Sequence, residues 1–271
     1  MVLGKLFNWM AVIVLPLSLL FVSGCNNSNI SEIQIVKKGE QLYQVSTIDA
    51  LLAGLYDGNL HVKDVQENGD FGLGTFDGID GEMIVHEGTV YQVLSTGSIV
   101  KADADRGVPF ASVHHFLSDL NATLESISTY DALKSALDRY TQCKNYPCAF
   151  KIHGTFNHVK ARSAPKASKP YPPLAEYISE NQNFFTAKDV TGTLIGYVLP
   201  AYFEKFNVPG YHFHFISDDR SFGGHVLEVS LKNASVELDR LFDMKLMLLR
   251  TPEFEKSTLQ SEEDDLDEVE R

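Results

Sequence analysis

The alternation of apolar and polar residues predicts a chain built mainly of β-strands, with a few helices. Helical periodicity is confined to residues 47–58 and to residues 130–140. Ser46 or Thr47 is the expected N-cap of the first of these helices. The remaining apolar or alternating runs predict strands at residues 33–45, 82–86, 89–93, 149–159, 192–199, 226–231 and 236–249. This mixture predicts an α+β fold.

Residues 211–225 carry the most chemical information in this pattern. His212 and His214 are two residues apart among aromatic and β-branched residues, so on a strand both side chains project from the same face. The polar residues 218–221 are typical of a turn, which would set His225 on the returning strand opposite His214. Three imidazoles on one face predict a catalytic zinc site, although other first-row divalent metals accept the same ligands.

The first 24 residues predict a lipoprotein signal peptide. Lys5 precedes an apolar run at residues 11–22, which is short for a membrane span and leads into a Val-Ser-Gly-Cys sequence ending at Cys25. That sequence resembles the lipobox of bacterial lipoproteins, in which the cysteine becomes the acylated first residue. We expect residues 1–24 to be removed, residues 25–32 to form a tether, and the exported chain to be membrane-anchored on the periplasmic or cell-surface face. A retained signal anchor is the alternative.

Cysteine content and charge narrow the chemistry further. With Cys25 acylated, Cys143 and Cys148 remain, and the sequence leaves open whether they form a disulfide. The 23 Lys and Arg residues against 36 Asp and Glu give a net charge of −13, without a basic cluster. This composition argues against nucleic acid as a partner. Much of the negative charge lies in residues 262–270, which are typical of a solvated acidic tail.

The Pro-rich residues 165–173 indicate a domain boundary or an active-site loop. We therefore predict an N-terminal β-rich domain at residues 33–163. A C-terminal metal-binding β domain with the acidic tail follows at residues 164–271.

Several motifs resemble those of the α-acetolactate decarboxylases, in the same order from about residue 34 to the C-terminus. The most specific is the Val-Pro-Gly-Tyr-His-Phe-His sequence at residues 208–214, followed by Gly-Gly-His at residues 223–225. The others are Leu73-Gly74-Thr75-Phe76, Asp80-Gly81-Glu82, Phe150-Lys151-Ile152-His153-Gly154, Val159-Lys160-Ala161-Arg162 and Pro172-Pro173-Leu174. The resemblance implies decarboxylation of (S)-2-acetolactate to (R)-acetoin, with zinc as electron sink for the enediolate and no organic cofactor.

The resemblance also implies site residues and an architecture. Zinc would be held by His212, His214 and His225. Arg162 would hold the substrate carboxylate or the developing oxyanion, with Glu82 and Thr75 nearby. A tail glutamate would reach over the metal; by counting this is Glu270, with Glu268 as the runner-up. The implied fold has two related β-sheet-plus-helix motifs with mixed sheets, the metal on the C-terminal half, and a homodimer.

Two other classes of protein remain as alternatives. A cupin-like enzyme also begins its metal site with His-x-His on a strand, but cupins usually add a glutamate a few residues later, and residues 216–220 contain none. A noncatalytic metal-binding lipoprotein is the other alternative. Such carriers tend to place their ligands on mobile loops, whereas this pattern places them on strands.

Overall fold

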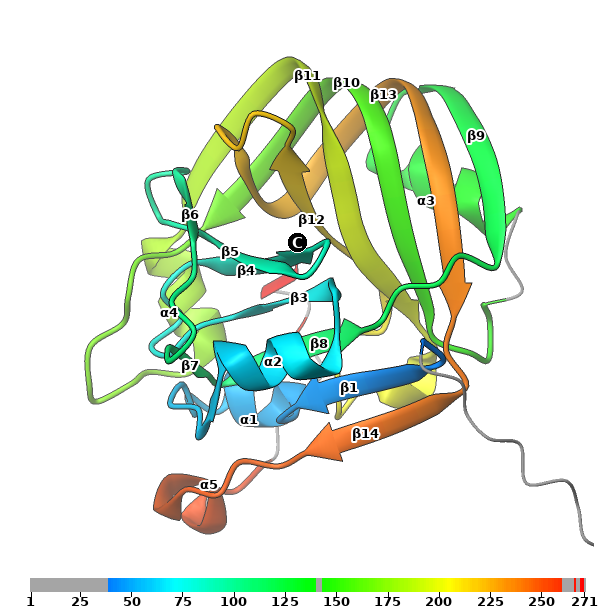
Figure 1. Cartoon of the computed structure of the whole chain (residues 1–271). Helices are drawn as coiled ribbons and strands as arrows, with labels where there is room; N and C mark the ends of the chain where they lie inside the picture. Colours follow the sequence, from blue (N-terminus) through cyan, green and yellow to red (C-terminus); the bar gives the residue numbers. More distant parts are fainter. Residues whose placement is uncertain (1–38, 140–142, 260–265, 267–268, 271) are drawn as a thin grey trace, which may run out of the picture. The chain divides into compact units, whose positions relative to one another are not determined.

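Two β-sheets packed against each other form the core of the chain (Figure 1). The computed structural model describes residues 39–139, 143–259, 266 and 269–270, which all belong to one compact unit, residues 36–271. The predicted signal peptide and tether lie outside the described residues. Within the described part, no helix has the length and apolar character needed to cross a membrane.

The first sheet is mixed, because β1 and β14 pair in parallel while its other neighbours are antiparallel. In spatial order its strands are β14 (Asp243–Met247), β1 (Gln41–Val45), β8 (Phe110–His114), β3 (Phe71–Thr75), β4 (Glu82–His86), β5 (Thr89–Val93) and β6 (Ile99–Lys101). Between β4 and β5, Glu87 and Gly88 have φ values of 51° and 74°. These values suit a tight hairpin turn between the two predicted strands.

The second sheet is antiparallel and strongly curved (Figure 1). Its order is β10 (Cys148–Ser163), β11 (Asn183–Leu199), β12 (Gly210–Ser217), β13 (Gly223–Arg240) and β9 (Leu120–Ile127). Strand β10 also pairs with β13, so β10, β11, β12 and β13 close into a ring. A separate short pair joins β2 (Leu60–His61) to β7 (Gly107–Val108).

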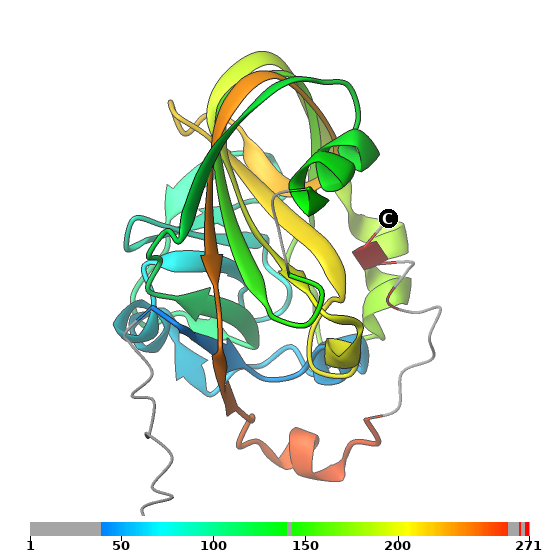
Figure 2. The same cartoon turned by 90° about the vertical axis from the view of Figure 1, so that its right-hand side faces the viewer.

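The helices cover the sheets and one end of the space between them. They are α1 (Ile48–Leu52), α2 (Val62–Asn68), α3 (Tyr130–Asp138), α4 (Leu174–Asn181), α5 (Pro252–Lys256) and the 3₁₀ helix η1 (Ala201–Phe203). Figure 2 shows α3 against the curved second sheet, where Leu133 and Leu137 are buried with Phe213 and Phe215 of β12. Since β12 alternates, burial of these phenylalanines turns the intervening histidine toward the first sheet.

The predicted α+β class is confirmed, with strands as the predominant regular structure among the described residues. All strands of the first sheet except β14 precede residue 117, and all strands of the second sheet follow it. The predicted domain boundary after residue 163, the relatedness of the two motifs and the homodimer remain predictions.

Three predictions about the elements were wrong. The first helix ends at Leu52 rather than near Gly58. Several short elements, among them α2, α4, α5, β3, β8 and β9, were not predicted, because short, Gly-rich or half-exposed segments give weak periodic signals. The strands predicted at residues 226–231 and 236–249 are instead β13, which continues through polar residues, and the separate β14. Pairing of β13 with β9 and β10 overrides that local polarity.

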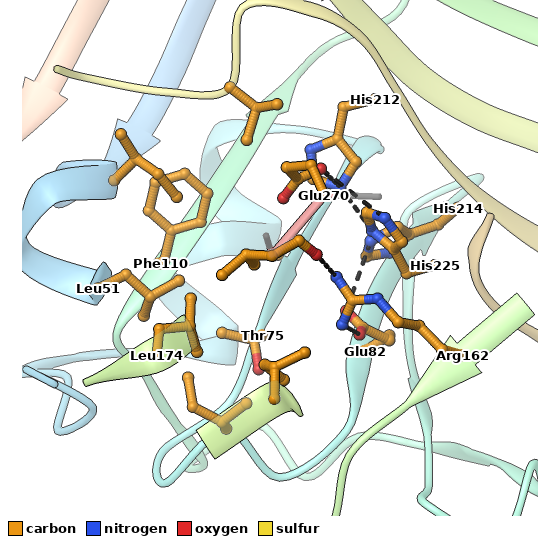
Figure 3. A pocket seen from close by; sticks show the side chains of 16 residues that line it. Leu51, Thr75, Glu82, Phe110, Arg162, Leu174, His212, His214, His225 and Glu270 are labelled. Atoms are coloured by element: carbon orange, nitrogen blue, oxygen red, sulfur yellow. Dashed lines mark hydrogen bonds and ion pairs between the residues drawn. The ribbon is translucent and has the colours of Figure 1, made fainter. Parts of the chain in front are cut away.

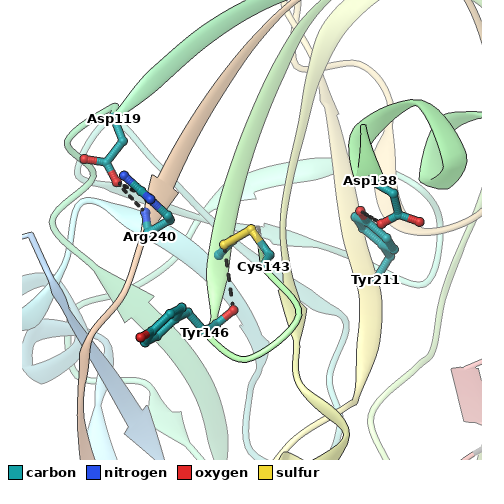
Figure 4. The surroundings of a disulfide bond; sticks show 7 residues. Asp119, Asp138, Cys143, Tyr146, Tyr211 and Arg240 are labelled. Carbon is teal, nitrogen blue, oxygen red and sulfur yellow. Dashed lines mark hydrogen bonds and ion pairs between the residues drawn. A yellow bond between two sulfur atoms is a disulfide. The ribbon is translucent and has the colours of Figure 1, made fainter. Parts of the chain in front are cut away.

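Cys143 and Cys148 form a disulfide, which the sequence had left open (Figure 4). Their α-carbons are 5.9 Å apart, within the usual range for a bridged pair. The bond closes the short loop that leads from α3 into β10.

A buried polar cluster joins the two sheets. The hydroxyl of Tyr197 on β11 lies 3.0 Å from Nδ1 of His114 on β8. Nε2 of His114 lies 3.3 Å from Oδ2 of Asp239 on β13. Burial lowers the pKa of His114, although Asp239 opposes this shift. The cluster therefore favours a neutral imidazole between the sheets.

We expect acid to destabilise the fold partly through His114. Because the pKa of His114 is lowered from 6.5 on folding, the unfolded chain takes up a proton below this pH that the folded chain resists. The free energy of unfolding should thus be retained above pH 6.5 and fall below it, by up to about 1.4 kcal/mol per pH unit for this group. Urea unfolding between pH 7 and 5 measures the slope. His114→Asn should make the free energy of unfolding depend less steeply on pH. His61→Asn is the control for the loss of one imidazole. An unchanged slope in His114→Asn would contradict the prediction.

Candidate active site

The three predicted histidines meet on one face of the second sheet (Figure 3). His214 on β12 pairs with His225 on β13, as the sequence pattern predicted. One ring nitrogen from each of the three histidines lies within 4.8 Å of the others. Nε2 of His212 is 3.0 Å from Nδ1 of His225. These nitrogens are close enough to share one metal ion.

Local interactions fix the hairpin that brings these histidines together. The carboxylate of Asp219 accepts hydrogen bonds from the hydroxyl groups of Ser221 and Ser217, both at 2.7 Å, and from the Ser221 backbone N–H at 3.0 Å. Such bonds lower the pKa of Asp219 to about 2. Gly224 has a φ of +139°, and a Cβ there would lie 2.5 Å from the carbonyl oxygen of Arg162. Only glycine permits this close approach.

The donor set fits a divalent metal ion. Nδ1 of His214 donates a hydrogen bond to the carbonyl oxygen of Met83 at 2.8 Å, which leaves Nε2 unprotonated. This Nε2 is buried and has no hydrogen-bond partner. Burial lowers the pKa of His212 to about 3, and lowers those of His214 and His225 well below the usual range. Metal binding requires neutral imidazoles oriented by such an outer hydrogen bond.

Arg162 lies beside the histidines because β10 pairs with β13. It stands opposite His225 in that pairing and is 3% exposed. Of the two terminal guanidinium nitrogens, Nη1 lies 3.6 Å from Oε1 of Glu82. Nη2 donates a hydrogen bond to the carbonyl oxygen of Val269 at 2.6 Å. The guanidinium thus connects the second sheet with the first sheet and with the C-terminal tail.

The first sheet contributes Glu82 and Thr75, which are paired across β4 and β3. Oε2 of Glu82 lies 3.5 Å from Nε2 of His214. Desolvation raises the pKa of Glu82 to about 7, against the opposing effect of Arg162. The hydroxyl of Thr75 donates to the carbonyl oxygen of Gly81 at 2.8 Å, so it holds the turn that precedes Glu82.

The C-terminal tail brings Glu270 into the pocket. Its Oε2 lies 3.8 Å from Nε2 of His212 and 3.7 Å from Nε2 of His225. Desolvation raises the pKa of Glu270 to about 7, while Arg162 opposes this shift. Val269 beside it is 4% exposed and packs in an apolar cluster with α1 and α4. Of the two tail glutamates predicted, Glu270 is thus at the site, and Glu268 lies outside the described residues.

Opposite these polar groups the pocket has an apolar wall, which sequence analysis did not assign to the site. Its members are Ile48, Leu51, Ile79, Phe110, Leu174, Ile178, Val208 and Val269. The periodicity of α1 identified Ile48 and Leu51 as buried. A sequence pattern cannot distinguish burial in a core from burial in a pocket wall, because both require the same apolar residues.

Fold and site together define a protein that gathers three histidines, one arginine and two glutamates in a buried pocket between two sheets. Residues 42–261 match the family described as Alpha-acetolactate decarboxylase. The chain belongs to this family.

Individual relatives agree with this assignment. The alpha-acetolactate decarboxylase of Methanosarcina mazei is 40% identical over 252 residues, which cover 90% of this chain and 87% of that protein. The Bacillus subtilis relative of the same name is 33% identical, with 84% and 92% covered.

Solved structures show the same fold. The crystal structure of alpha-acetolactate decarboxylase from Bacillus subtilis strain 168 has a TM-score of 0.82 at 33% identity, covering 85% of this chain and 99% of that one. A Staphylococcus aureus protein, described as of unknown function but similar to alpha-acetolactate decarboxylase, has a TM-score of 0.79 at 28% identity. There 84% of this chain and 98% of that one are covered.

We expect the three histidines to bind a divalent metal ion with a stoichiometry of about one ion per chain. His214→Ala removes the buried Nε2 that has no hydrogen-bond partner, so it should weaken zinc binding by at least about 100-fold. Isothermal titration calorimetry of the chelator-treated protein measures this affinity. His153→Ala, on β10 but outside the group, is the matched control. Equal affinities in the two variants would show that the ion binds elsewhere.

Proposed function

We propose that the chain catalyses the decarboxylation of (S)-2-acetolactate to (R)-acetoin and CO2 in this pocket. The observation that carries the proposal is the convergence of His212, His214 and His225 with Arg162 and two carboxyl groups, in a chain of this family. The substrate is a β-keto acid, so loss of CO2 leaves an electron pair that must be stabilised before a proton replaces the carboxylate. The site must therefore hold an anion, stabilise developing charge and deliver one proton.

The three histidines would hold the metal ion, for which we propose zinc. Bound there, it would supply a Lewis acid that withdraws the electron pair left by the departing CO2. The neutral state of the imidazoles and the hydrogen bond from His214 to Met83 support this assignment.

Arg162 is proposed to hold the substrate carboxylate or the developing oxyanion. Its Nη2 donates a hydrogen bond to the carbonyl oxygen of Val269, but its buried Nε has no hydrogen-bond partner. An unsatisfied, permanently charged donor inside a pocket is suited to an anionic ligand. Removal of water by the apolar wall would strengthen this interaction.

Glu82 and Glu270 are the proposed proton donors to carbon. They enter from the first sheet and from the tail respectively, so they approach the histidines from different elements. A donor fixed on one side protonates one face of the planar intermediate, which would set the configuration of the product. Thr75 is proposed to act as a positioning residue, through the turn at Gly81.

The alternatives considered from the sequence are a cupin-like enzyme and a noncatalytic metal-binding lipoprotein. No contact among the described residues favours either over the decarboxylase. A carrier has no evident use for the buried ion pair of Arg162 and Glu82 beside its metal.

We expect acetoin to form from racemic 2-acetolactate, to be lost on chelation and to return with added zinc. His214→Ala should abolish this activity because it removes a metal ligand. Glu270→Gln, which keeps the shape but not the acid, should lower kcat by about 100-fold or more. Glu253→Gln on α5 is the matched control. Tight zinc binding without acetoin from the unmodified protein would contradict the proposed activity, and full activity of Glu270→Gln would contradict the role of that residue.

We also propose that the chain is an exported lipoprotein, anchored through Cys25. The apolar run and lipobox-like sequence support this proposal. The disulfide between Cys143 and Cys148 supports it independently, since disulfides persist mainly in oxidising compartments.

Expression of the full chain in a bacterium tests this anchor. We expect the protein in the membrane fraction, with a mass that corresponds to an acylated chain beginning at Cys25. Cys25→Ser should prevent acylation and processing, which mass spectrometry of the intact protein detects. If the unmodified protein, like the Cys25→Ser variant, were full-length and not acylated, the lipobox assignment would be ruled out.

A further inference from the structure

Exposed apolar side chains gather where the chain enters the described fold. Among the described residues, eight large hydrophobic side chains are at least 42% exposed, and four of them lie in this region. We call these four the entry surface: Leu117 (63% exposed), Tyr146 (48%), Tyr202 (64%) and Phe242 (52%). A cluster of this kind on a protein surface marks an interaction site more often than isolated exposed residues do.

Contacts with the first described residues place this surface at the entry point. The backbone N–H of Phe242 donates to the carbonyl oxygen of Glu40 at 2.9 Å. A Cβ built on Gly39 would lie 3.4 Å from the Cβ of Leu117. The chain therefore enters the fold between two members of the entry surface.

Other contacts make the surface rigid. The rings of Tyr146 and Phe242 have centroids 5.3 Å apart. The hydroxyl of Tyr202 donates to the carbonyl oxygen of Asn145, beside Tyr146, at 3.0 Å. The disulfide closes the loop that carries Tyr146 (Figure 4). These aromatic side chains are thus held in place although they are about half exposed to water.

Basic residues lie close in sequence to three of the aromatic rings, and one of them also contacts its ring. Lys144 and Lys205 are exposed, and Cζ of Arg240 lies 6.0 Å from the centroid of the Phe242 ring. Acidic neighbours partly balance them, since Nε of Arg240 lies 3.2 Å from Oδ2 of Asp119 and Nζ of Lys205 lies 4.0 Å from Oε1 of Glu204. Aromatic rings flanked by Lys and Arg are suited to the headgroup layer of a bilayer, where rings find an amphipathic environment and cations find lipid phosphates.

We propose that the entry surface rests on the lipid bilayer to which Cys25 anchors the chain. Gly39 follows Cys25 by 39 − 25 = 14 residues. Whatever its conformation, a segment of that length reaches at most about 50 Å, so the anchor keeps the entry surface near the lipid. The anchor thus gives the entry surface a high effective concentration at the bilayer, so a few interfacial side chains suffice to hold this surface against the lipid. The inference rests on the proposed lipid anchor and goes beyond the proposed activity, with which it shares no residue.

The test anchors the protein chemically, so that it does not depend on acylation in a cell. Residues 36–271 form one compact unit, so a chain that begins at Cys25 retains the whole fold. Because the other two cysteines are joined, Cys25 supplies the free thiol. It is coupled to a maleimide lipid in vesicles of phosphatidylethanolamine and phosphatidylglycerol. Hydrogen–deuterium exchange is then compared on vesicles and in solution.

We expect peptides covering residues 143–148, 201–206 and 241–243 to exchange at least about threefold more slowly on vesicles. A variant that combines Tyr146→Ser, Tyr202→Ser and Phe242→Ser should lose this protection. The matched control Phe184→Ser, 54% exposed on β11 and outside the entry surface, should retain it. Far-UV circular dichroism and thermal unfolding of each variant report whether its fold is intact.

Three results would overturn the proposal. One is unchanged exchange of these peptides on vesicles, and another is equal protection in the triple variant. The third is protection that appears without vesicles and grows with protein concentration, which would identify a second copy of the chain as the occupant. None of these readouts depends on decarboxylation, so failure of this inference and failure of the proposed activity are separable.

Discussion

The antiparallel register of β10, β13 and β12 is the constraint on which the rest of the site depends. It sets Arg162 opposite His225, and His225 opposite His214, so three functional side chains stand in a row across three strands. A shift of one residue in this register would turn a whole set of side chains to the other face of the sheet. The buried phenylalanines of β12 oppose such a shift, because it would move them out of the core against α3. Hydrophobic packing on one face thereby enforces the geometry of the site on the other.

The site also depends on the contact between the two sheets. The first sheet supplies the Met83 carbonyl group that orients His214, as well as the Glu82 carboxyl group. Burial between the sheets keeps the imidazoles neutral and raises the pKa of Glu82 to about 7. These groups carry a desolvation cost, which Arg162 offsets in part through its positive charge. Removal of one charged member would leave the others buried without compensation.

The sequence allowed the central part of the site to be predicted, because the information lay in local alternation. His212, His214, the turn and His225 occupy 14 consecutive positions, and strand periodicity alone placed all three imidazoles on one face. Thr75, Glu82, Arg162 and Glu270 came from the family resemblance, since they meet only through long-range pairing. The apolar wall and strand β9 were not predicted. Val269 shows why: its burial depends on α1 and α4, more than 80 residues away in sequence, and nothing in the acidic segment around it indicates an anchor.

The pocket assembles side chains from Ile48 to Glu270, so no isolated segment of the chain contains it. Glu82 and the tail reach the histidines only after both sheets have formed and docked. Metal ligands arranged in this way do not exist in the unfolded chain, and ion binding then stabilises the folded state. Binding of the proposed metal ion would therefore be coupled to folding, and the compartment in which the chain folds would determine which ions compete for the three imidazoles.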